Sequence, residues 1–511
     1  MKKILFPLLI VIFTVNINAQ TIDYDKYFTD KSLRMDVFQC GMRDTSHYVF
    51  DKFIIEQYFG GSKVNLIDNL NFGTNRVKVV DATSNNVIYT HGYNTLFQEW
   101  QNTDEALVLE RCYEESVSVP LPKNKAFIVL EIRNRITGDF DEIFSKLFNP
   151  NEIFNSTEQR YIFPVYDVLV HGNPSEKVDV IILPEGYTED EMEKFKTDCN
   201  NLVNILKKQE PFSSHINDFN FRAVLAPSEE SGTDIPSENK WVRTILNSHF
   251  NTFYIDRYCT TRNYFSVKDV AANAPYDQIY ILVNSNLYGG GGLYNYYSLS
   301  TSGNMSADKV IIHEFGHAFA GLADEYEEPD SPLALLYNLE IEPWEANLTT
   351  LVDFDSKWSD LVEEDTPIPT SCYGPYGNKV GAFEGGGYLE TGMYRPQCHC
   401  MMRDYFPFCA VCYKTIEDVI AVHCDTTIDE SIKYPIQNNH SFNVYPNPTS
   451  KYINIYLNNV NSDSAEIIDI NGNVVLKIDL DDKIKHQDVS MLSKGIYFVK
   501  IDNEIVKFVK N

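Results

Sequence analysis

Apolar and polar residues alternate in short runs over the first third of the chain. Examples are NRVKVVDA, NNVIYTHG and KAFIVLEIRNR, and turn-forming Gly, Asn and Asp separate such runs. Alternation with a period of two places successive side chains on opposite faces of a strand. The pattern therefore predicts an N-terminal β-sandwich domain over residues 20–165.

The pattern changes near residue 166, where longer apolar runs begin to alternate with helical periodicity. KVDVIILPEGYTEDEMEKFKTDCNNLVNILKK opens with a continuous apolar strand, followed by Thr188 as a helix cap with acidic residues in the first turn. FNFRAVLAP and YDQIYILVNS have the composition of further strands. Strands that alternate with helices predict an α/β domain, which we place at residues 166–428.

A polar stretch, TTIDESIKYPIQNNHS, follows this domain and predicts a linker at residues 429–440. Beyond it, three alternating stretches are joined by Asn-Gly and Lys-Gly turns. These features predict a small C-terminal all-β sandwich module over residues 441–511.

The N-terminus, MKKILFPLLIVIFTVNINAQ, places two lysines before an apolar run and a small residue, Ala19, at a plausible cleavage site. This is typical of a signal peptide at residues 1–19. A membrane anchor is the alternative, but the run is too short to span a bilayer comfortably. We expect export through the periplasm and no integral membrane span.

Charge and cysteine content narrow the function further. The chain has 43 Lys and Arg against 72 Asp and Glu, a net charge of −29, which argues against nucleic acid as a partner. The segment CHCMMRDYFPFCAVC holds four of the ten cysteines: Cys398, Cys400, Cys409 and Cys412. Export favours disulfides for this cluster, with partners among these residues, Cys372 and Cys424. A second, structural zinc ion is the alternative.

The stretch ADKVIIHEFGHAFAGLADEY carries the strongest chemical signal. Ser306, just before it, can cap a helix on which His313 and His317 lie one turn apart on the same face. Two imidazoles so placed can bind one zinc ion, and Glu314 can reach a water molecule at the metal. The alternative is a core helix with two hydrogen-bonded histidines, and we favour zinc because of the helical context and the predicted export.

Catalytic zinc also needs a third protein ligand and an open coordination position. Gly321 can end the helix in a left-handed turn. Asp324 follows on the returning chain and is the predicted third ligand. Glu325, with its longer side chain, is the alternative for this role. The carboxylates of this acidic loop could also bind calcium or face solvent.

The motif HEFGHAFAGLADEY resembles the signature of the M64, or IgA-peptidase-like, family of metallopeptidases. Other stretches between about residues 166 and 425 are similar to that family: LPEGYTEDEM, APSEESGTDIP, NSNLYGGGGLYNYYSLST and CMMRDYFPFCAVC. The N-terminal β region resembles the domain that usually precedes this peptidase unit. The resemblance implies a zincin-like (metzincin-like) fold and one catalytic Zn²⁺.

The C-terminal module is similar to the type A sorting domain of the Bacteroidetes type IX secretion system. The similar pieces are YPNPTSKYINI, DINGNVV and KGIYFVKI. The resemblance implies an interaction with the type IX secretion machinery and a secreted or cell-surface location. A carbohydrate-binding or adhesive β-domain is the alternative.

Three further groups are candidates for the site. The glycine run, Tyr288, Gly289, Gly290, Gly291 and Gly292, is predicted to form a sheet edge along which an extended substrate pairs, or else a flexible loop. Met401 or Met402 lies where related zinc peptidases have a methionine turn, although a packing role is nearly as well supported. Tyr405 or Arg403 is a candidate to stabilise the oxyanion.

These features predict a secreted zinc metallo-endopeptidase acting on proteins or peptides, host glycoproteins among them. Zinc would polarise the scissile carbonyl and activate a water molecule, and Glu314 would act as the general base. The alternatives are a catalytically silent adhesin with the same fold and a zinc amidase that cleaves a cell-wall or glycan-linked amide. The presence of Glu314 and the expected ligands argues against the adhesin.

Overall fold

The computed structural model describes residues 22–329 and 331–424 and, with short gaps, residues 442–510. The predicted signal peptide and linker lie outside the described residues. The described chain up to Cys424 belongs, apart from residues 134–139, to one compact unit, and the strands after residue 441 belong to a second. None of the described helices is long and apolar enough to cross a membrane.

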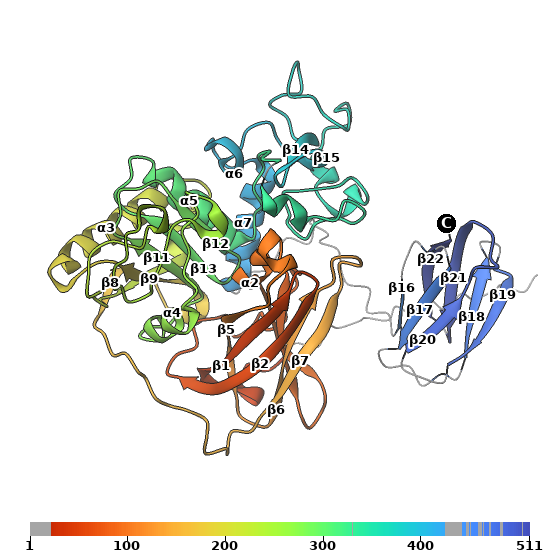
Figure 1. Cartoon of the computed structure of the whole chain (residues 1–511), viewed down its shortest axis with the longest axis horizontal. Coiled ribbons are helices and arrows are strands. Elements are labelled where there is room, and N and C mark those ends of the chain that lie inside the picture. Colours follow the sequence, from red (N-terminus) through yellow and green to blue (C-terminus); the bar gives the residue numbers. More distant parts are fainter. Residues whose placement is uncertain are drawn as a thin grey trace, which may run out of the picture. The chain divides into compact units, whose positions relative to one another are not determined.

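The N-terminal region consists of two antiparallel sheets that share a hydrophobic core, as predicted (Figure 1). The first sheet has the order β2-β1-β5: β2 (Thr45–Glu56), β1 (Phe28–Met42) and β5 (Arg111–Pro122). The second has the order β4-β3-β6-β7: β4 (Val87–Tyr93), β3 (Asn75–Asp81), β6 (Ala126–Arg133) and β7 (Phe140–Phe148). Two short helices accompany them: α1 (Tyr24–Tyr27) and α2 (Leu96–Trp100).

The alternation in NRVKVVDA, which forms β3, determines what each face of this strand contacts. Val77 and Val79 of β3 are buried in the core between the sheets. Arg76 and Lys78 point to the other face, where both pair with Glu131 of the neighbouring strand β6 at 2.6 and 2.7 Å. The period-two pattern thus separates a hydrophobic face from a charged one.

The following domain is built on a six-stranded sheet of order β12-β13-β11-β9-β10-β8. The strands β9, β10, β11 and β13 run parallel, and β8 and β12 pair antiparallel with their neighbours. The strands are β8 (Val165–Leu169), β9 (Val178–Glu185), β10 (Phe219–Val224), β11 (Gln278–Val283), β12 (Gly290–Leu293) and β13 (Tyr297–Thr301). All eight residues of β9 are buried, because helices cover both faces of the sheet.

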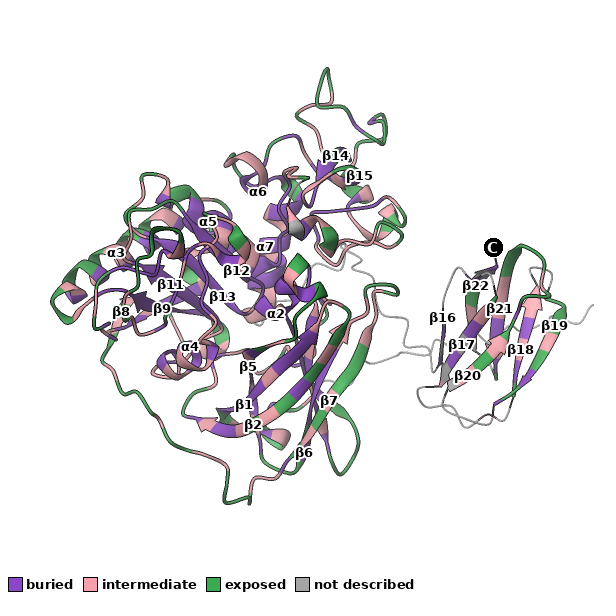
Figure 2. Ribbon diagram, viewed as in Figure 1, coloured by how far each residue is buried: buried purple, intermediate pink, exposed green. Residues whose placement is uncertain are grey.

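Alternate residues of β9 belong to two different cores. Val180 and Ile182 pack in one core with α3 (Met192–Leu206), α5 (Ala307–Ala320) and α7 (Ala410–His423). Ile181 and Leu183 pack in the other with α4 (Tyr264–Ala271) and α2 of the N-terminal region. Figure 2 shows the central strands of this sheet largely in purple, the colour of buried residues. The predicted cap of Thr188 is present as a capping box with Glu191, which leads through a 3-10 turn into α3.

The remaining elements of this unit are short. They comprise the hairpin β14 (Phe383–Gly386) and β15 (Leu389–Arg395) and the helix α6 (Met401–Asp404). Single-turn 3-10 helices occur at Asp104–Leu107, Pro174–Glu176, Glu189–Glu191, Ile216–Asp218, Pro236–Glu238, Thr252–Tyr254, Pro332–Leu336, Phe354–Ser356 and Ser359–Leu361.

The C-terminal unit is a small all-β module of two antiparallel sheets around one core, as predicted. One sheet has the order β16-β17-β20: β16 (Phe442–Tyr445), β17 (Tyr452–Leu457) and β20 (Ile484–Asp488). The other has the order β19-β18-β21-β22: β19 (Val474–Asp479), β18 (Ser464–Asp469), β21 (Gly495–Ile501) and β22 (Glu504–Lys510).

Candidate active site

Helix α5 carries both histidines and packs on the six-stranded sheet. Ser306 stands at the predicted N-cap position, but its side chain makes no capping hydrogen bond, and its backbone N–H donates to Asn304 Oδ1 at 2.8 Å. The predicted end at Gly321 is confirmed, since this residue has a φ of 60° and donates to His317 O at 3.0 Å. This left-handed turn sends the chain back toward the helix.

Three ligand-type atoms meet beside α5 after this turn. His313 Nε2 and His317 Nε2 lie 3.1 Å apart, and Asp324 Oδ1 lies 3.1 Å from the first and 3.3 Å from the second. Of the two carboxylates considered, Asp324 is thus the one beside the histidines. The three residues form one of the two groups in the described chain that could hold a metal ion.

The ring nitrogens and the carboxylate oxygen that face away from this meeting point are hydrogen-bonded to other residues. The three atoms that face one another keep their lone pairs. His313 Nδ1 bonds to Met401 O at 3.1 Å and His317 Nδ1 to Leu322 O at 2.6 Å. A carbonyl oxygen only accepts, so each Nδ1 carries a proton, and each Nε2 is an acceptor when its ring is neutral. Asp324 Oδ2 accepts from the Tyr388 hydroxyl, and the buried Oδ1 has no hydrogen-bond partner. Three converging acceptors fit a metal cation.

Electrostatics at the site favour a positive charge at the same place. Burial opposes the imidazolium of His317, yet the adjacent carboxylate of Asp324 raises the pKa of this ring to about 9. Burial likewise opposes the carboxylate of Asp324, but the two histidines hold its pKa well below its usual range. Protons and a metal ion therefore compete for these groups.

Glu314 lies on α5 against the glycine run. A Cβ on Gly290 would approach Glu314 Cγ and Oε1 to 2.8 Å, and one on Gly292 would approach Glu314 O to 2.3 Å. The glycines therefore let β12 lie directly on α5. Burial raises the pKa of Glu314, and the neighbouring histidines oppose this shift.

Part of the edge formed by the glycine run is occupied by the chain itself. Strand β12 is the last strand of its sheet, but Gly290 O accepts from the Cys259 N–H at 3.1 Å. Gly290 N–H donates to Arg257 O at 3.2 Å. An incoming strand cannot use these two backbone groups, because the chain itself already pairs with them.

One cavity of about 460 Å³ adjoins these groups. Its lining includes every predicted site residue: His313, Glu314, His317, Asp324, Tyr288, Gly289, Gly290, Gly291, Gly292 and Tyr405. The N-terminal region contributes Glu99, which accepts a hydrogen bond from the Tyr258 hydroxyl. Burial raises the pKa of Glu99 to about 7. No local sequence pattern points to Glu99 or Tyr388, because both are distant from the motif along the chain.

The two candidates for oxyanion stabilisation differ in their partners. The Tyr405 hydroxyl is hydrogen-bonded to that of Tyr288, and the Tyr405 ring lies 5.7 Å from the His313 ring. Arg403 Nη2 instead forms an ion pair with Glu327 at 2.9 Å. The geometry therefore favours Tyr405 over Arg403.

The two methionines and Glu325 lie behind the histidines. Met402 is fully buried, and a Cβ on Gly316 would come within 2.9 Å of its sulfur, so Met402 packs under the helix turn between the histidines. Glu325 donates its backbone N–H to Met402 O at 2.8 Å, while its Oε1 accepts from Asn347 Nδ2 at 2.9 Å. The side chain of Glu325 thus points away from the histidines.

The cysteines divide into bonded and free groups. Disulfides join Cys40 to Cys112 and Cys372 to Cys398. The expectation of disulfides throughout the C-terminal cluster is wrong for Cys400, Cys409 and Cys412, which are buried and free. Their side chains gather around Glu325 rather than around Cys372, the bonded partner of Cys398.

A His-Glu-x-x-His helix, a third acidic group and an adjoining cavity define a metal-dependent hydrolase. The family model of the IgA peptidase M64 matches residues 167–374 and 372–420, and that of the peptidase M64 N-terminus matches residues 23–145. The chain belongs to the M64 family and is a peptidase. No curated protein matches the chain significantly.

A third family model, the secretion system C-terminal sorting domain, matches residues 443–511. This domain indicates export by the type IX secretion system. The protein is therefore secreted or held at the cell surface, and the secretion machinery is a partner of its C-terminal module.

Proposed function

We propose that the protein is a zinc-dependent metallo-endopeptidase that hydrolyses peptide bonds of extracellular proteins. One observation carries the proposal: His313 Nε2, His317 Nε2 and Asp324 Oδ1 converge within 3.3 Å beside the cavity that Glu314 lines. Two imidazoles and one carboxylate are ligands that zinc accepts in catalytic sites with one open position. Bound there, zinc would polarise the scissile carbonyl and lower the pKa of a water molecule.

Glu314 is the proposed general base. Its carboxylate lies on the same helix as both histidines and borders the cavity, so it can accept the proton of the attacking water. The same carboxyl group can then deliver the proton to the leaving amine. Gly290 leaves room for this side chain and Gly292 for the Glu314 backbone, since a Cβ at either position would collide with Glu314.

The remaining residues would bind and orient the substrate. We assign the pair of hydroxyls of Tyr405 and Tyr288 to the oxyanion of the tetrahedral intermediate, because both border the cavity and neither is fully buried. The glycine run would form the adjoining wall. The mixed sheet, the helix beside β12 and the buried Met402 support a zincin-like (metzincin-like) fold with Met402 as the methionine turn.

Removal of the metal tests the proposal. Treating the full-length protein with a chelator should abolish its cleavage of an unfolded protein substrate, and stoichiometric zinc should restore it, because no protein group replaces the Lewis acid. Elemental analysis before and after would identify the metal. Immunoglobulin, mucin and peptidoglycan, assayed in parallel, would separate a peptidase from an amidase. Unchanged proteolysis by fully metal-free protein would overturn the proposal.

Deletion of residues 441–511 should separate export from catalysis. The module has its own hydrophobic core, so we expect the truncated protein to keep its peptidase activity but to accumulate in the periplasm of the native host. Fractionation and an activity assay on each fraction provide the measurement. The full-length Glu314→Gln protein is the control, since it should be exported normally. Surface display of the truncated protein would contradict the expectation.

A further inference from the structure

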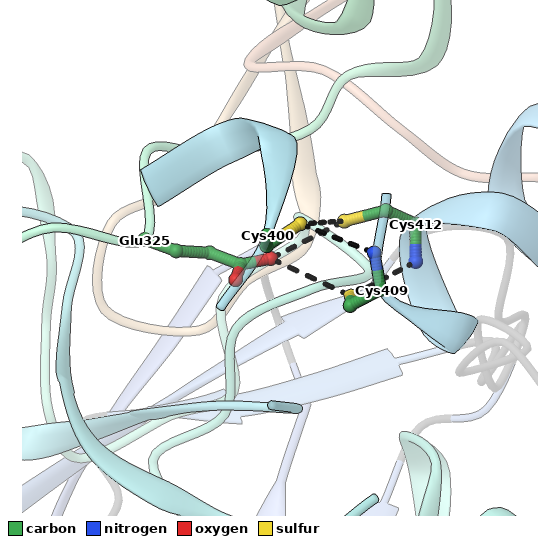
Figure 3. A group of neighbouring side chains, drawn as sticks. All are labelled: Glu325, Cys400, Cys409 and Cys412. Carbon is green, nitrogen blue, oxygen red and sulfur yellow. Dashed lines mark hydrogen bonds between the residues drawn. The ribbon is translucent and has the colours of Figure 1, made fainter. Parts of the chain in front are cut away.

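A second group of metal-binding side chains lies behind the catalytic histidines, at Glu325, Cys400, Cys409 and Cys412 (Figure 3). All four residues are buried, and their ligand atoms lie within 4.8 Å of one another. None of the four lines the catalytic cavity. We propose that they bind a second, structural zinc ion.

The distances fit a tetrahedral zinc site. Zinc–sulfur bonds of about 2.3 Å at tetrahedral angles place two sulfur atoms about 3.8 Å apart. Cys400 Sγ and Cys412 Sγ are 3.7 Å apart. A zinc–oxygen bond of about 2.1 Å similarly predicts a sulfur–oxygen distance of about 3.6 Å. Glu325 Oε1 lies 3.2 Å from Cys412 Sγ and 3.8 Å from Cys409 Sγ.

Backbone N–H groups donate to two of the three sulfur atoms. Cys409 is the N-cap residue of α7, and its Sγ accepts the N–H of Cys412 at 3.4 Å. Cys400 Sγ accepts the N–H of Cys409 at 3.3 Å. Amide donors and the positive end of a fourteen-residue helix favour negatively charged sulfur, which is the form that binds metal.

Glu325 supplies the fourth ligand and an independent indication of a cation. Its side chain is fully buried, and its Oε2 has no hydrogen-bond partner. A buried carboxylate with an unpaired oxygen is costly unless a positive charge lies nearby. Figure 3 shows the carboxylate pointing at the cysteine sulfur atoms. A divalent cation would offset half of the four negative charges of the ionised cluster.

Disulfide bonds account for the cluster less well. Three cysteines cannot be fully paired with one another, because one disulfide leaves a single thiol beside Glu325. The chain is exported, and four of its other cysteines are disulfide-bonded, so unprotected thiols would face oxidising conditions. A metal ion would bind all three sulfur atoms and protect them.

The position of the cluster assigns it a role in supporting the catalytic site. Glu325 directly follows Asp324, and Cys400 directly precedes Met401, whose carbonyl orients His313. An ion shared by Glu325 and Cys400 would fix both chain segments to each other and to the start of α7. The second zinc would therefore maintain the orientation of the first-site ligands without contacting substrate.

Cobalt substitution in the full-length protein tests this inference. Cobalt(II) bound by thiolates absorbs strongly in the near ultraviolet, whereas the catalytic centre contains no sulfur ligand. We expect two zinc ions per chain in the native protein and this absorption after exchange. In Cys412→Ser, the absorption should disappear and the zinc content should fall to one ion. In Asp324→Ala, the absorption should remain although the catalytic metal is lost.

Cys199→Ser is the matched control, since Cys199 is a buried free cysteine of α3 that is not one of the four grouped residues, and it should leave the absorption unchanged. If Cys412→Ser does not fold, thiol titration of the native protein decides: the cluster should react only after chelation. A single zinc ion with no sulfur absorption, or a disulfide among Cys400, Cys409 and Cys412 by mass spectrometry, would overturn the inference. Either result leaves the proposed function untouched.

Discussion

Replacing Glu314 with Gln is expected to lower turnover at least about a hundredfold while the metal stays bound. The amide keeps the size of the side chain and its fit against Gly290 but cannot accept the proton of the attacking water. The three converging ligand atoms come from other residues, so metal content should equal that of the native protein. Steady-state cleavage of a peptide substrate and elemental analysis provide both measurements.

Asp308→Asn is the matched control for this experiment. Asp308 lies in the first turn of the same helix but is exposed and borders no part of the cavity. The same carboxylate-to-amide change there should leave turnover within about twofold, because only a weak interaction with the helix dipole is lost. Near-normal proteolysis by Glu314→Gln would rule out this residue as the general base.

Asp324→Ala should remove the catalytic metal and the activity together. The substitution deletes the only carboxylate oxygen that faces both histidine Nε2 atoms among the described residues. With two imidazoles alone, the site lacks the third ligand that catalytic zinc requires. Activity and metal content, measured on the same preparation at equal protein concentration, report the effect.

Tyr388→Phe provides a graded comparison for Asp324→Ala. It removes only the hydroxyl that donates to Asp324 Oδ2, so the ligand stays but is less well oriented. Loss of such an outer contact lowers metal affinity by about 10- to 100-fold, which a competing chelator can measure. The third-ligand assignment would be wrong if Asp324→Ala kept its catalytic activity. Loss of both the activity and the catalytic metal in Glu325→Ala would then identify Glu325 as the ligand.

The parts of the site that sequence alone could predict are those set by local spacing. The interval between His313 and His317 fixes their common face on any α-helix, and Gly321 supplies the left-handed conformation that ends it. Ser306 occupies the N-cap position, but its φ of −101° and ψ of 11° lie outside the extended region of a capping residue, and its side chain accepts no helix N–H. Whether a serine side chain reaches the helix N–H groups depends on the loop conformation as well as on residue type.

Contacts made across the fold could not be predicted in this way. Tyr388 reaches Asp324 from a hairpin 64 residues further along the chain, and no periodicity relates the two. The cysteines illustrate the same limit, since Cys398 and Cys400 are two residues apart yet belong to different chemical environments. The predicted sheets were recovered because alternation with a period of two directly reflects burial of one strand face.

The N-terminal β region and the peptidase domain share a hydrophobic core, so they cannot be separated as independently folded fragments. Leu96, Phe97 and Trp100 of the N-terminal region pack with α4 and with one face of the peptidase sheet. A fragment starting at residue 166 would leave this apolar face in water, at a cost of roughly 1.5–3 kcal/mol for each large side chain that loses its burial. The N-terminal region is therefore an integral part of the folded catalyst rather than a detachable prosegment. Cleavage between residues 148 and 165 would therefore nick the chain without releasing either half.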